Sequence, residues 1–367
     1  MKTAKIWLCI GLLFALTLPA SALQIIRGPY LQQVTQTTIV VMWQTDEAAD
    51  SAVDYGPTDA YGSTATAPGD ATIHEVTLTS LAPDTAYHYR VRSGAVKSDD
   101  STLRTAARPG TPFRFAVYGD TQSNPDWHRR VAAGIVSAQP RIVIHCGDEV
   151  GDGNNYDSWQ TEFFDPAAEL MRTTPMYVAI GNHERNSHWF YDLHSYPKPE
   201  DYYSFDYGSA HFVIVDTSQD YDDKSQQYKW LEADLASDAA QKADWLFVAY
   251  HMPGYCEGWD HPGYDGEEDV RSYVMPLLEK YGVDMVFNGH AHDYERGFYR
   301  GVYYVISGGG GGALDSFRRR FGHVWTSQYV HHYCTVDIDG PRLTLQAVTP
   351  EGQVIDRLEI HKRPWPR

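Results

Sequence analysis

The chain has 367 residues, 43% of them apolar and 13% aromatic, which is typical of a globular protein with about two domains. Its formal net charge of −18 argues against general binding to nucleic acids or to anionic membranes. The sequence shows no internal repeat of the kind that builds solenoids or propellers.

Residues 1–22 are predicted to be a signal peptide. A basic start, MKTAK, precedes the apolar run IWLCIGLLFALTL and the small-residue sequence Ala20-Ser21-Ala22. The apolar run is short for a membrane span of about 20 residues, so no span is expected in the mature chain. We therefore expect export to the periplasm or to the extracellular space.

Residues 23–107 are predicted to form an N-terminal β-sandwich of the fibronectin III/immunoglobulin-like type. Short segments with turns between them read as strands: IIRGPYLQQV, TTIVVMWQT, SAVDYG, IHEVTLTSL, AYHYRVRSG and STLRTA. The stretch LAPDTAYHYRV resembles the fibronectin type III pattern, and Trp43 is the candidate core tryptophan. The segment contains no cluster of ligand-type residues, so no chemistry is assigned to it.

Residues 108–367, after the linker AARPGTP, are predicted to form a layered α/β domain. Six near-continuous apolar runs indicate strands buried on both faces: FRFAVYGD, RIVIHCGD, MYVAIGNH, HFVIVDT, DWLFVAYH and VDMVFNGH. Helices are expected at DWHRRVAAGIVSA, SWQTEFFDPAAELMR, QQYKWLEADLAS and EEDVRSYVMPLLEKYG. The C-terminal tail returns to hairpins with DG and EG turns.

Three cysteines lie outside the predicted signal peptide. Cys146 ends an apolar run and is expected to be a buried thiol. A disulfide between Cys256 and Cys334 is a possible pairing. The sequence has no CxxC pair, so neither a thiolate zinc site nor a redox role is expected.

Five of the buried strands end on residues that commonly bind metals. They are Asp120, Asp148, Asn182 with His183, His251, and the pair His290 and His292. In an open α/β sheet, ligands gather beyond the carboxyl ends of the strands. Each residue alone has an ordinary structural explanation as a turn or a hydrogen-bonded core residue. Together, in this order, they predict two divalent or trivalent ions (Fe, Zn or Mn) that share one carboxylate.

The ordered pattern GD…GD…GNHE…H…GHxH resembles the calcineurin-like metallophosphoesterases. The module in front, the opening RGPYLQQVTQTTIVVMWQTD and the ending GHAHDYER are similar to the purple acid phosphatase branch and its bacterial relatives. This resemblance covers essentially the whole mature chain. It implies a four-layer metallophosphoesterase domain, with two packed mixed sheets flanked by helices, that hydrolyses phosphate monoesters as acid phosphatases do.

The resemblance also distributes the ligands between two metal sites. It implies that Asp148 bridges both ions. It further implies a second site completed by Asn182, His251 and His290, and a first site held by Asp120 and His292.

Two departures from the family pattern concern the first site. The purple enzymes carry a tyrosine three residues after the bridging aspartate, where this chain has Gly151. Other phosphoesterases have D-x-H in the first block, where this chain has Asp120-Thr121-Gln122. A purple iron centre is therefore not expected. Gln122 is interpreted as a neutral ligand of the first metal; the alternative is a hydrogen bond to substrate or to bridging water.

The expected reaction is direct attack of a metal-bridging hydroxide on the phosphate ester. His183 is expected to stabilise the developing charge or to protonate the leaving alkoxide, the alternative being that it only orients a ligand. Arg296 and His128 are weaker candidates for phosphate contacts, and Arg296 could equally be a structural ion-pair partner. The glycine run at 307–312 is expected to pack close to the metal site.

Two other functions remain open. One is a phosphodiesterase acting on nucleotides or glycerophosphodiesters, and the other is a non-catalytic surface or adhesion protein with a vestigial metal site. In the preferred interpretation the partner is a small phosphorylated substrate, and the aromatic and acidic loops at 186–203 and 254–269 shape its pocket.

Overall fold

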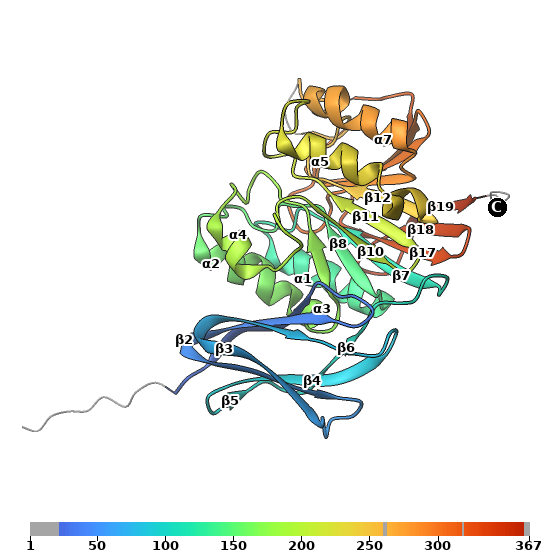
Figure 1. Ribbon diagram of the computed structural model, residues 1–367. Coiled ribbons are helices and arrows are strands. Elements are labelled where there is room, and N and C mark those ends of the chain that lie inside the picture. The colour runs from blue at the N-terminus through green and yellow to red at the C-terminus, as the bar shows by residue number, and fades with distance from the viewer. Residues whose placement is uncertain (1–21, 260–262, 318, 363–367) are drawn as a thin grey trace, which may run out of the picture.

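The computed structural model describes residues 22–259, 263–317 and 319–362, so the predicted signal peptide lies outside the described residues except for its last one. A strand-rich N-terminal part is followed by a larger part that mixes strands and helices (Figure 1). Among the helices of the described ranges, none has the length and apolar character needed to cross a membrane.

The N-terminal part is one hydrogen-bonded sheet built around a single long strand. Its order is β1-β2-β4-β5, with β3 on β2 and β6 on β4. The bounds are β1 Ile25–Gln32, β2 Ile39–Gly56, β3 Ser63–Leu78, β4 Ala86–Ser93, β5 Val96–Lys97 and β6 Ser101–Arg104. The segments TTIVVMWQT and SAVDYG, expected as separate strands, are thus both part of β2. Irregular pairing with β3 between Gln44 and Ser51 lets this strand bend without ending.

The two halves of β2 have different partners. The first half pairs with β1 and the second with β4, while β3 follows both halves. The buried indole N–H of Trp43, in the first half, donates to Oγ of Ser93 at the end of β4 at 2.9 Å. The Trp43 ring is fully buried and stacks on His74. Trp43 is therefore the core tryptophan, as the sequence predicted.

The α/β part contains two mixed sheets. The first has the order β19-β18-β17-β7-β8-β9, and the second β10-β11-β12-β13-β15-β14-β16. The first sheet comprises β7 Phe113–Tyr118, β8 Ile142–His145, β9 Met176–Val178, β17 Tyr333–Asp339, β18 Arg342–Val348 and β19 Val354–His361. The second comprises β10 Tyr203–Tyr207, β11 Ala210–Ile214, β12 Trp245–Ala249, β13 Met285–Asn288, β14 Tyr294–Tyr299, β15 Val302–Ser307 and β16 Val324–Gln328.

The alternation of side chains along the strands packs these sheets face to face. Phe115 of β7 contacts Phe212, Phe247 and Phe287 of the second sheet, with ring centroids 5.1 to 5.9 Å apart. The residues between them, such as Val248, point the other way into a separate apolar cluster. Strands buried on both faces explain the near-continuous apolar runs of the sequence.

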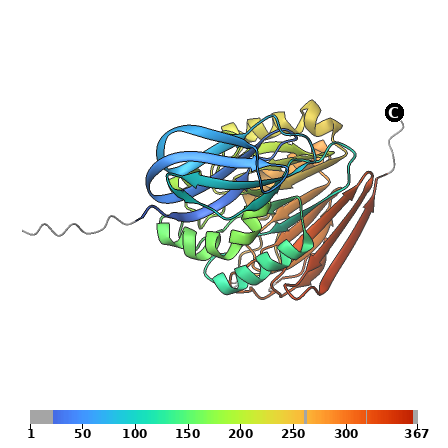
Figure 2. The same cartoon turned by 90° about the horizontal axis from the view of Figure 1, so that it is seen from below.

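Helices cover the two outer faces and complete a four-layer arrangement, which confirms the predicted fold class. Helices α5 and α7 supply Leu231 and Leu278 to the outer cluster of the second sheet, and α1 packs Ile135 against the first. Figure 2 shows the helices on both sides. The bounds are α1 Pro125–Ala138, α2 Tyr156–Ser158, η1 Trp159–Phe164, α3 Asp165–Thr173, α4 His188–Leu193, α5 Gln226–Leu235, α6 Asp238–Lys242, η2 Val270–Val274 and α7 Met275–Tyr281, where η marks a π-helical segment.

The N-terminal part is joined to the α/β part by buried contacts. The hydroxyl of Tyr30 donates to the carbonyl of Leu193 at 2.7 Å, and that of Tyr89 donates to the carbonyl of Arg172 at 2.7 Å. The Tyr30 ring lies 5.0 Å from that of Phe164. One apolar cluster therefore runs through both parts. At the predicted boundary near residue 107 the sequence changes from short strands to strands that alternate with helices, but the two cores are continuous across it.

The possible Cys256–Cys334 disulfide is wrong. Cys146, Cys256 and Cys334 are all free thiols and all buried. Cys334 lies on β17 in the first sheet, whereas Cys256 lies in a loop that packs beside the second sheet in a different apolar cluster. Burial raises the pKa of the Cys334 thiol to about 12, so this side chain stays protonated.

Stability is expected to fall in alkaline solution because of His211. Its Nδ1 lies 2.7 Å from Asp206 and its Nε2 lies 3.0 Å from Asp234. Burial lowers the pKa of His211, but the hydrogen bonds to the two carboxylates outweigh this effect and raise it to about 9. The stabilisation is fully present below about pH 6.5 and is lost as the pH rises through 9. The free energy of unfolding should fall by about 1–3 kcal/mol over this range. Denaturant unfolding of wild type and His211→Gln at pH 6 and pH 10 measures this change. An equal loss of unfolding free energy in both proteins would show that His211 is not the cause.

Candidate metal centre

The predicted ligands come from loops at one edge of both sheets. Asp120, Asp148 and Asn182 follow β7, β8 and β9 of the first sheet, and His251 and His290 follow β12 and β13 of the second. These strands run parallel to their neighbours, so their carboxyl ends meet at the same edge. The five strand ends are thus brought together as the sequence predicted.

Three of these residues have a backbone that L-amino acids rarely adopt. Asp120, Asp148 and His290 have φ angles of 59°, 54° and 72°. Each follows a glycine. A Cβ on Gly147 would lie 2.8 Å from the carbonyl oxygen of Ala179, and one on Gly289 would lie 2.4 Å from Oδ2 of Asp120. Strained backbone of this kind concentrates at functional sites, where the surrounding structure holds it.

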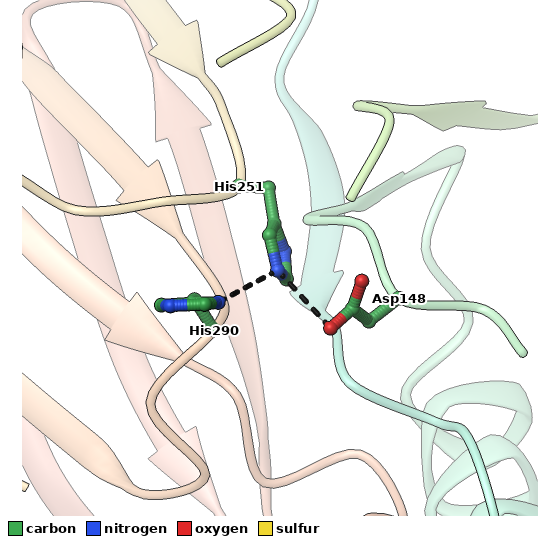
Figure 3. Close-up of side chains that lie close together, drawn as sticks. All are labelled: Asp148, His251 and His290. Atoms are coloured by element: carbon green, nitrogen blue, oxygen red, sulfur yellow. Dashed lines mark hydrogen bonds and ion pairs between the residues drawn. The ribbon is translucent and has the colours of Figure 1, made fainter. Parts of the chain in front are cut away.

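Asp148, His251 and His290 form the centre of the cluster, with ligand atoms within 4.8 Å of one another (Figure 3). The Nε2 atom of His251 lies 3.2 Å from Oδ2 of Asp148 and 3.1 Å from Nδ1 of His290. It also lies 3.1 Å from Oδ1 of Asn182. Four side chains therefore present nitrogen or oxygen atoms to one point.

Hydrogen bonding fixes which of these atoms carry lone pairs. His251 Nδ1 lies 2.8 Å from the carbonyl oxygen of Cys146 and must donate a proton to it. In the neutral ring, His251 Nε2 then offers a lone pair toward Asp148 Oδ2 and Asn182 Oδ1, which are acceptors. Facing lone pairs repel unless a cation lies between them. The donor set, one carboxylate, one amide oxygen and two imidazoles, fits a borderline transition-metal ion.

A second group of side chains also lies near Asp148. The Nε2 atom of His292 lies 3.6 Å from Oδ1 of Asp120. Its Nδ1 donates to the carbonyl of Ala313 at 2.7 Å, so its Nε2 also offers a lone pair. The amide nitrogen of Gln122 lies 3.2 Å from this Nε2 and 3.4 Å from Asp148 Oδ2. Oδ2 of Asp120 and Oε1 of Gln122 are buried without a hydrogen-bond partner, which fits a second cation site.

His183 lies beside Asp148 and is partly exposed. Its Nδ1 donates to the carbonyl of Gly151 at 2.8 Å, which turns Nε2 to within 3.9 Å of Asp148 Oδ2. Its side chain is 41% exposed, so its ring can reach a substrate from solvent. The backbone N–H of His183 donates to Asp148 Oδ1 at 2.9 Å.

The electrostatics of the cluster suit cations. Burial, followed by the charge of Asp148, raises the pKa of Asp120 well above its ordinary value. Burial also lowers the pKa of His290 to about 3, aided by neighbouring His251, so the ring is neutral as a metal ligand must be. Asp120 therefore needs positive charge nearby to remain ionised.

Three acidic residues that position the ligands were not singled out from the sequence. Glu184 accepts hydrogen bonds from the backbone N–H groups of Asp148 and Gly181, and it is fully buried. Glu162 accepts hydrogen bonds from the backbone N–H groups of Ser123 and Gly151. Asp315 accepts one from the backbone N–H of His292. Glu184 could have been found, because it completes the GNHE block. Glu162 and Asp315 carry no local sequence signal.

The remaining sequence candidates have structural roles. Arg296 is buried against Asp356, with Nε 2.6 Å from the carboxylate, so it is the ion-paired residue of the alternative interpretation. His128 is buried and donates to the carbonyl of Glu162 at 2.8 Å. The glycine run packs against the site as expected: a Cβ on Gly312 would lie 2.7 Å from the His292 ring.

Changes at Gln122 are expected to alter the first metal site selectively. Gln122→His supplies an imidazole in place of an amide and should tighten binding of the first ion, whereas Gln122→Ala should weaken it by roughly 10-fold. The Asn182–His251–His290 side should keep its ion in both variants. Competitive chelator titration with metal analysis measures the two affinities. Unchanged affinity in both variants would leave Gln122 as a hydrogen-bond donor only.

Comparison with known proteins decides the family. Residues 113–294 match the family profile described as calcineurin-like phosphoesterase. Residues 28–105 match the purple acid phosphatase N-terminal domain. The chain belongs to the calcineurin-like phosphoesterases. Within this family it is purple acid phosphatase-like, and its N-terminal part is the domain that precedes the phosphoesterase domain in that branch.

Relatives and solved structures agree with this placement. Purple acid phosphatase 21 of Arabidopsis thaliana is 33% identical over 61% of this chain and 53% of its own length. Probable inactive purple acid phosphatase 27 of the same plant is 28% identical over 67% and 50%. The chain therefore spans about half the length of the curated relatives it matches. A purple acid phosphatase from yellow lupin (Lupinus luteus) seeds shares the fold, with a TM-score of 0.81, 22% identity, and coverage of 91% and 74%.

Proposed function

We propose that this protein is an exported dimetal phosphoesterase that hydrolyses phosphate monoesters as acid phosphatases do. The observation that carries the proposal is the convergence on Asp148 of every ligand that the family pattern assigns. Asn182, His251 and His290 would hold one ion, and Asp120 and His292 would hold the other, assisted by Gln122. Two bound cations would activate water and hold phosphate oxygens for in-line displacement.

The chain's own residues prepare the site for this reaction. The carbonyls of Cys146 and Ala313 hold the His251 and His292 rings with lone pairs turned inward. Glu184 binds three successive N–H groups of the loop that carries Asp148, at residues 148, 149 and 150. The ligands are therefore held in place by protein contacts that do not involve a metal, so little rearrangement is needed on binding.

His183 is proposed as the residue that protonates the leaving alkoxide. Its Nδ1 is occupied by the carbonyl of Gly151, which leaves Nε2 to face the reacting centre. A positioned histidine of this kind contributes about 100- to 10,000-fold to proton transfer. If His183 only oriented a ligand, its removal would change metal affinity and leave the pH profile unaltered.

The first site lacks the tyrosine of the purple enzymes. Gly151 occupies that position, and a Cβ there would lie 3.1 Å from Ser123 Oγ. Without a phenolate, ferric charge-transfer colour is not expected, and fewer anionic ligands favour a divalent ion such as zinc or manganese over ferric iron.

Native metal content and substrate preference test the proposal together. Protein purified without chelator should contain about two metal ions per chain and hydrolyse p-nitrophenyl phosphate faster than bis(p-nitrophenyl) phosphate. Faster diester hydrolysis would favour the phosphodiesterase alternative. Bound metal without hydrolysis of either ester would favour a non-catalytic protein, which has precedent in the names of relatives described as probable inactive purple acid phosphatases. Fractionation of the producing cells tests export.

A further inference from the structure

A polar recess of about 540 Å³ opens beside the metal centre. Its walls come from the loops after β9 and β11, with Met252 after β12. The residues that matter for recognition are Asn182, Arg185, Asn186, Gln219 and Asp220. Asn182 belongs to both the recess and the ligand cluster, so a molecule in the recess lies next to the metals. The volume is within the range of about 300–1,000 Å³ that small-molecule sites occupy.

We propose that this recess binds the leaving group of the substrate, and that this group is an uncharged polyhydroxylated alcohol such as a sugar or glycerol. The inference rests on the proposed function, since it places the alcohol that His183 would protonate. His183 lies between Asn182 and Arg185, two residues that line the recess. Its Nδ1 donates to the carbonyl of Gly151, the residue before the Asp152 that pairs with Arg185, so the proposed acid is close to the recess.

The side chains of the recess suit hydroxyl groups. Arg185 donates hydrogen bonds, Asp220 accepts them, and Asn186 and Gln219 do both. Hydroxyl groups also donate and accept, so they can pair with this mixed set. Arg185 and Asp220 are the charged residues that line the recess, and Asp152 pairs with Arg185, so the recess has no excess positive charge. The chain as a whole carries −18, which also disfavours a second anionic group on the substrate.

The side of the metal centre formed by His290 differs in character. There the Trp259 ring stacks on His290 with centroids 4.6 Å apart, and Tyr264 packs against the same ring at 5.4 Å. An aromatic leaving group would find its contacts on that side. Among the described residues that line the recess, Met252 is the one with a large apolar side chain, so the recess favours a polar group.

The backbone and the exposed ion pair of Arg185 also point to a binding role. Arg185 and Asn186 are consecutive non-glycine residues with φ angles of 54° and 48°, a strained arrangement of the kind found at ligand-binding loops. Arg185 pairs with Asp152 at 3.1 Å, and the two side chains are 57% and 49% exposed. Exposed ion pairs contribute only about 0–1 kcal/mol, so the guanidinium can turn to a substrate at little cost.

Arg185→Met tests the proposal, because methionine keeps the length of the side chain and removes its donors. With the native metals bound, the variant should lose about 10-fold in kcat/KM for glycerol 3-phosphate, as expected when a charged hydrogen bond is removed. Its kcat/KM for phenyl phosphate should stay within about twofold. The matched control is Arg129→Met: Arg129 is 55% exposed and pairs with Asp126 outside the recess. Arg129→Met should leave kcat/KM unchanged for both substrates.

Equal losses on both substrates, or no loss on glycerol 3-phosphate, would overturn the recess as the leaving-group site. Ligand-detected NMR of glycerol 3-phosphate binding separates this failure from failure of the proposed function. Arg185-dependent binding without turnover would uphold the recess and refute the phosphatase activity. Turnover of phenyl phosphate together with Arg185-independent binding of glycerol 3-phosphate would uphold the activity and refute the recess. Neither binding nor turnover would refute both.

Discussion

Asp148→Ala is expected to remove both metal ions and to lower phosphatase activity by well over 100-fold. Asp148 Oδ2 lies within 3.2 Å of His251 and 3.4 Å of Gln122, so its carboxylate is shared by the two ligand groups. Loss of a residue that merely supports a ligand typically costs about 10- to 100-fold, and loss of a shared ligand should cost more. Metal analysis after gel filtration and initial rates with p-nitrophenyl phosphate measure the two effects.

Two further variants separate metal loss from misfolding. Asp148→Asn retains the shape and one oxygen donor, so it should keep part of the metal. Asp356→Asn removes a carboxylate that pairs with Arg296 away from the metal centre. It should reduce stability and leave the metal content unchanged. Wild-type turnover by Asp148→Ala with metal bound would show that Asp148 does not bridge the two sites.

Tyr30→Ala is expected to destabilise the whole protein by about 3–5 kcal/mol, the range for truncating a large buried aromatic residue. Tyr30 belongs to the N-terminal part, is 1% exposed, and packs against Phe164 of the α/β part. Because the two parts share an apolar cluster, we also expect one cooperative unfolding transition for the full chain. Denaturant unfolding followed by tryptophan fluorescence and by far-UV circular dichroism measures both.

Tyr30→Phe isolates the hydrogen bond to the carbonyl of Leu193 and should cost about 1–2 kcal/mol, because a buried acceptor loses its partner. Tyr329→Phe is the matched control. Tyr329 also donates to a backbone carbonyl, that of Leu314 at 2.8 Å, but it is 54% exposed. Water can replace that bond, so the expected cost is below about 0.5 kcal/mol. Two separate transitions, or a Tyr30→Ala cost near that of Tyr329→Phe, would show that the N-terminal part folds independently.

Local sequence patterns predicted the layered α/β domain and the clustering of the candidate ligands, and the family resemblance implied the four-layer form. Runs such as DWLFVAYH indicate buried strands, and a polar residue at the end of each run places ligands at one sheet edge. The sequence could not predict which strands merge: the bend in β2 depends on its pairing with β3, which is a long-range contact. The same holds for the contact between Tyr30 and Leu193, residues far apart in the chain.

The site was predictable to the extent that its ligands follow strands directly. Glu162 and Arg185 show the limit. Glu162 reaches the cluster from a π-helical segment, and Arg185 lines a recess formed by two loops that only the fold brings together. The disulfide prediction failed for a related reason, since cysteine counting cannot tell which sheet each cysteine lies near.

The ligands are divided between the two sheets, and this division has a mechanical consequence. Asp148 and Asn182 belong to the β7–β8–β9 sheet, and His251 and His290 to the β12–β13 sheet. Ions bound here would cross-link the loops at one edge of the two facing sheets, so separating the sheets would require breaking coordination bonds. Chelation should therefore lower resistance to heat and to proteolysis by an amount set by metal affinity, even though the apolar layer between the sheets stays intact. The metals would then contribute to stability as well as to chemistry.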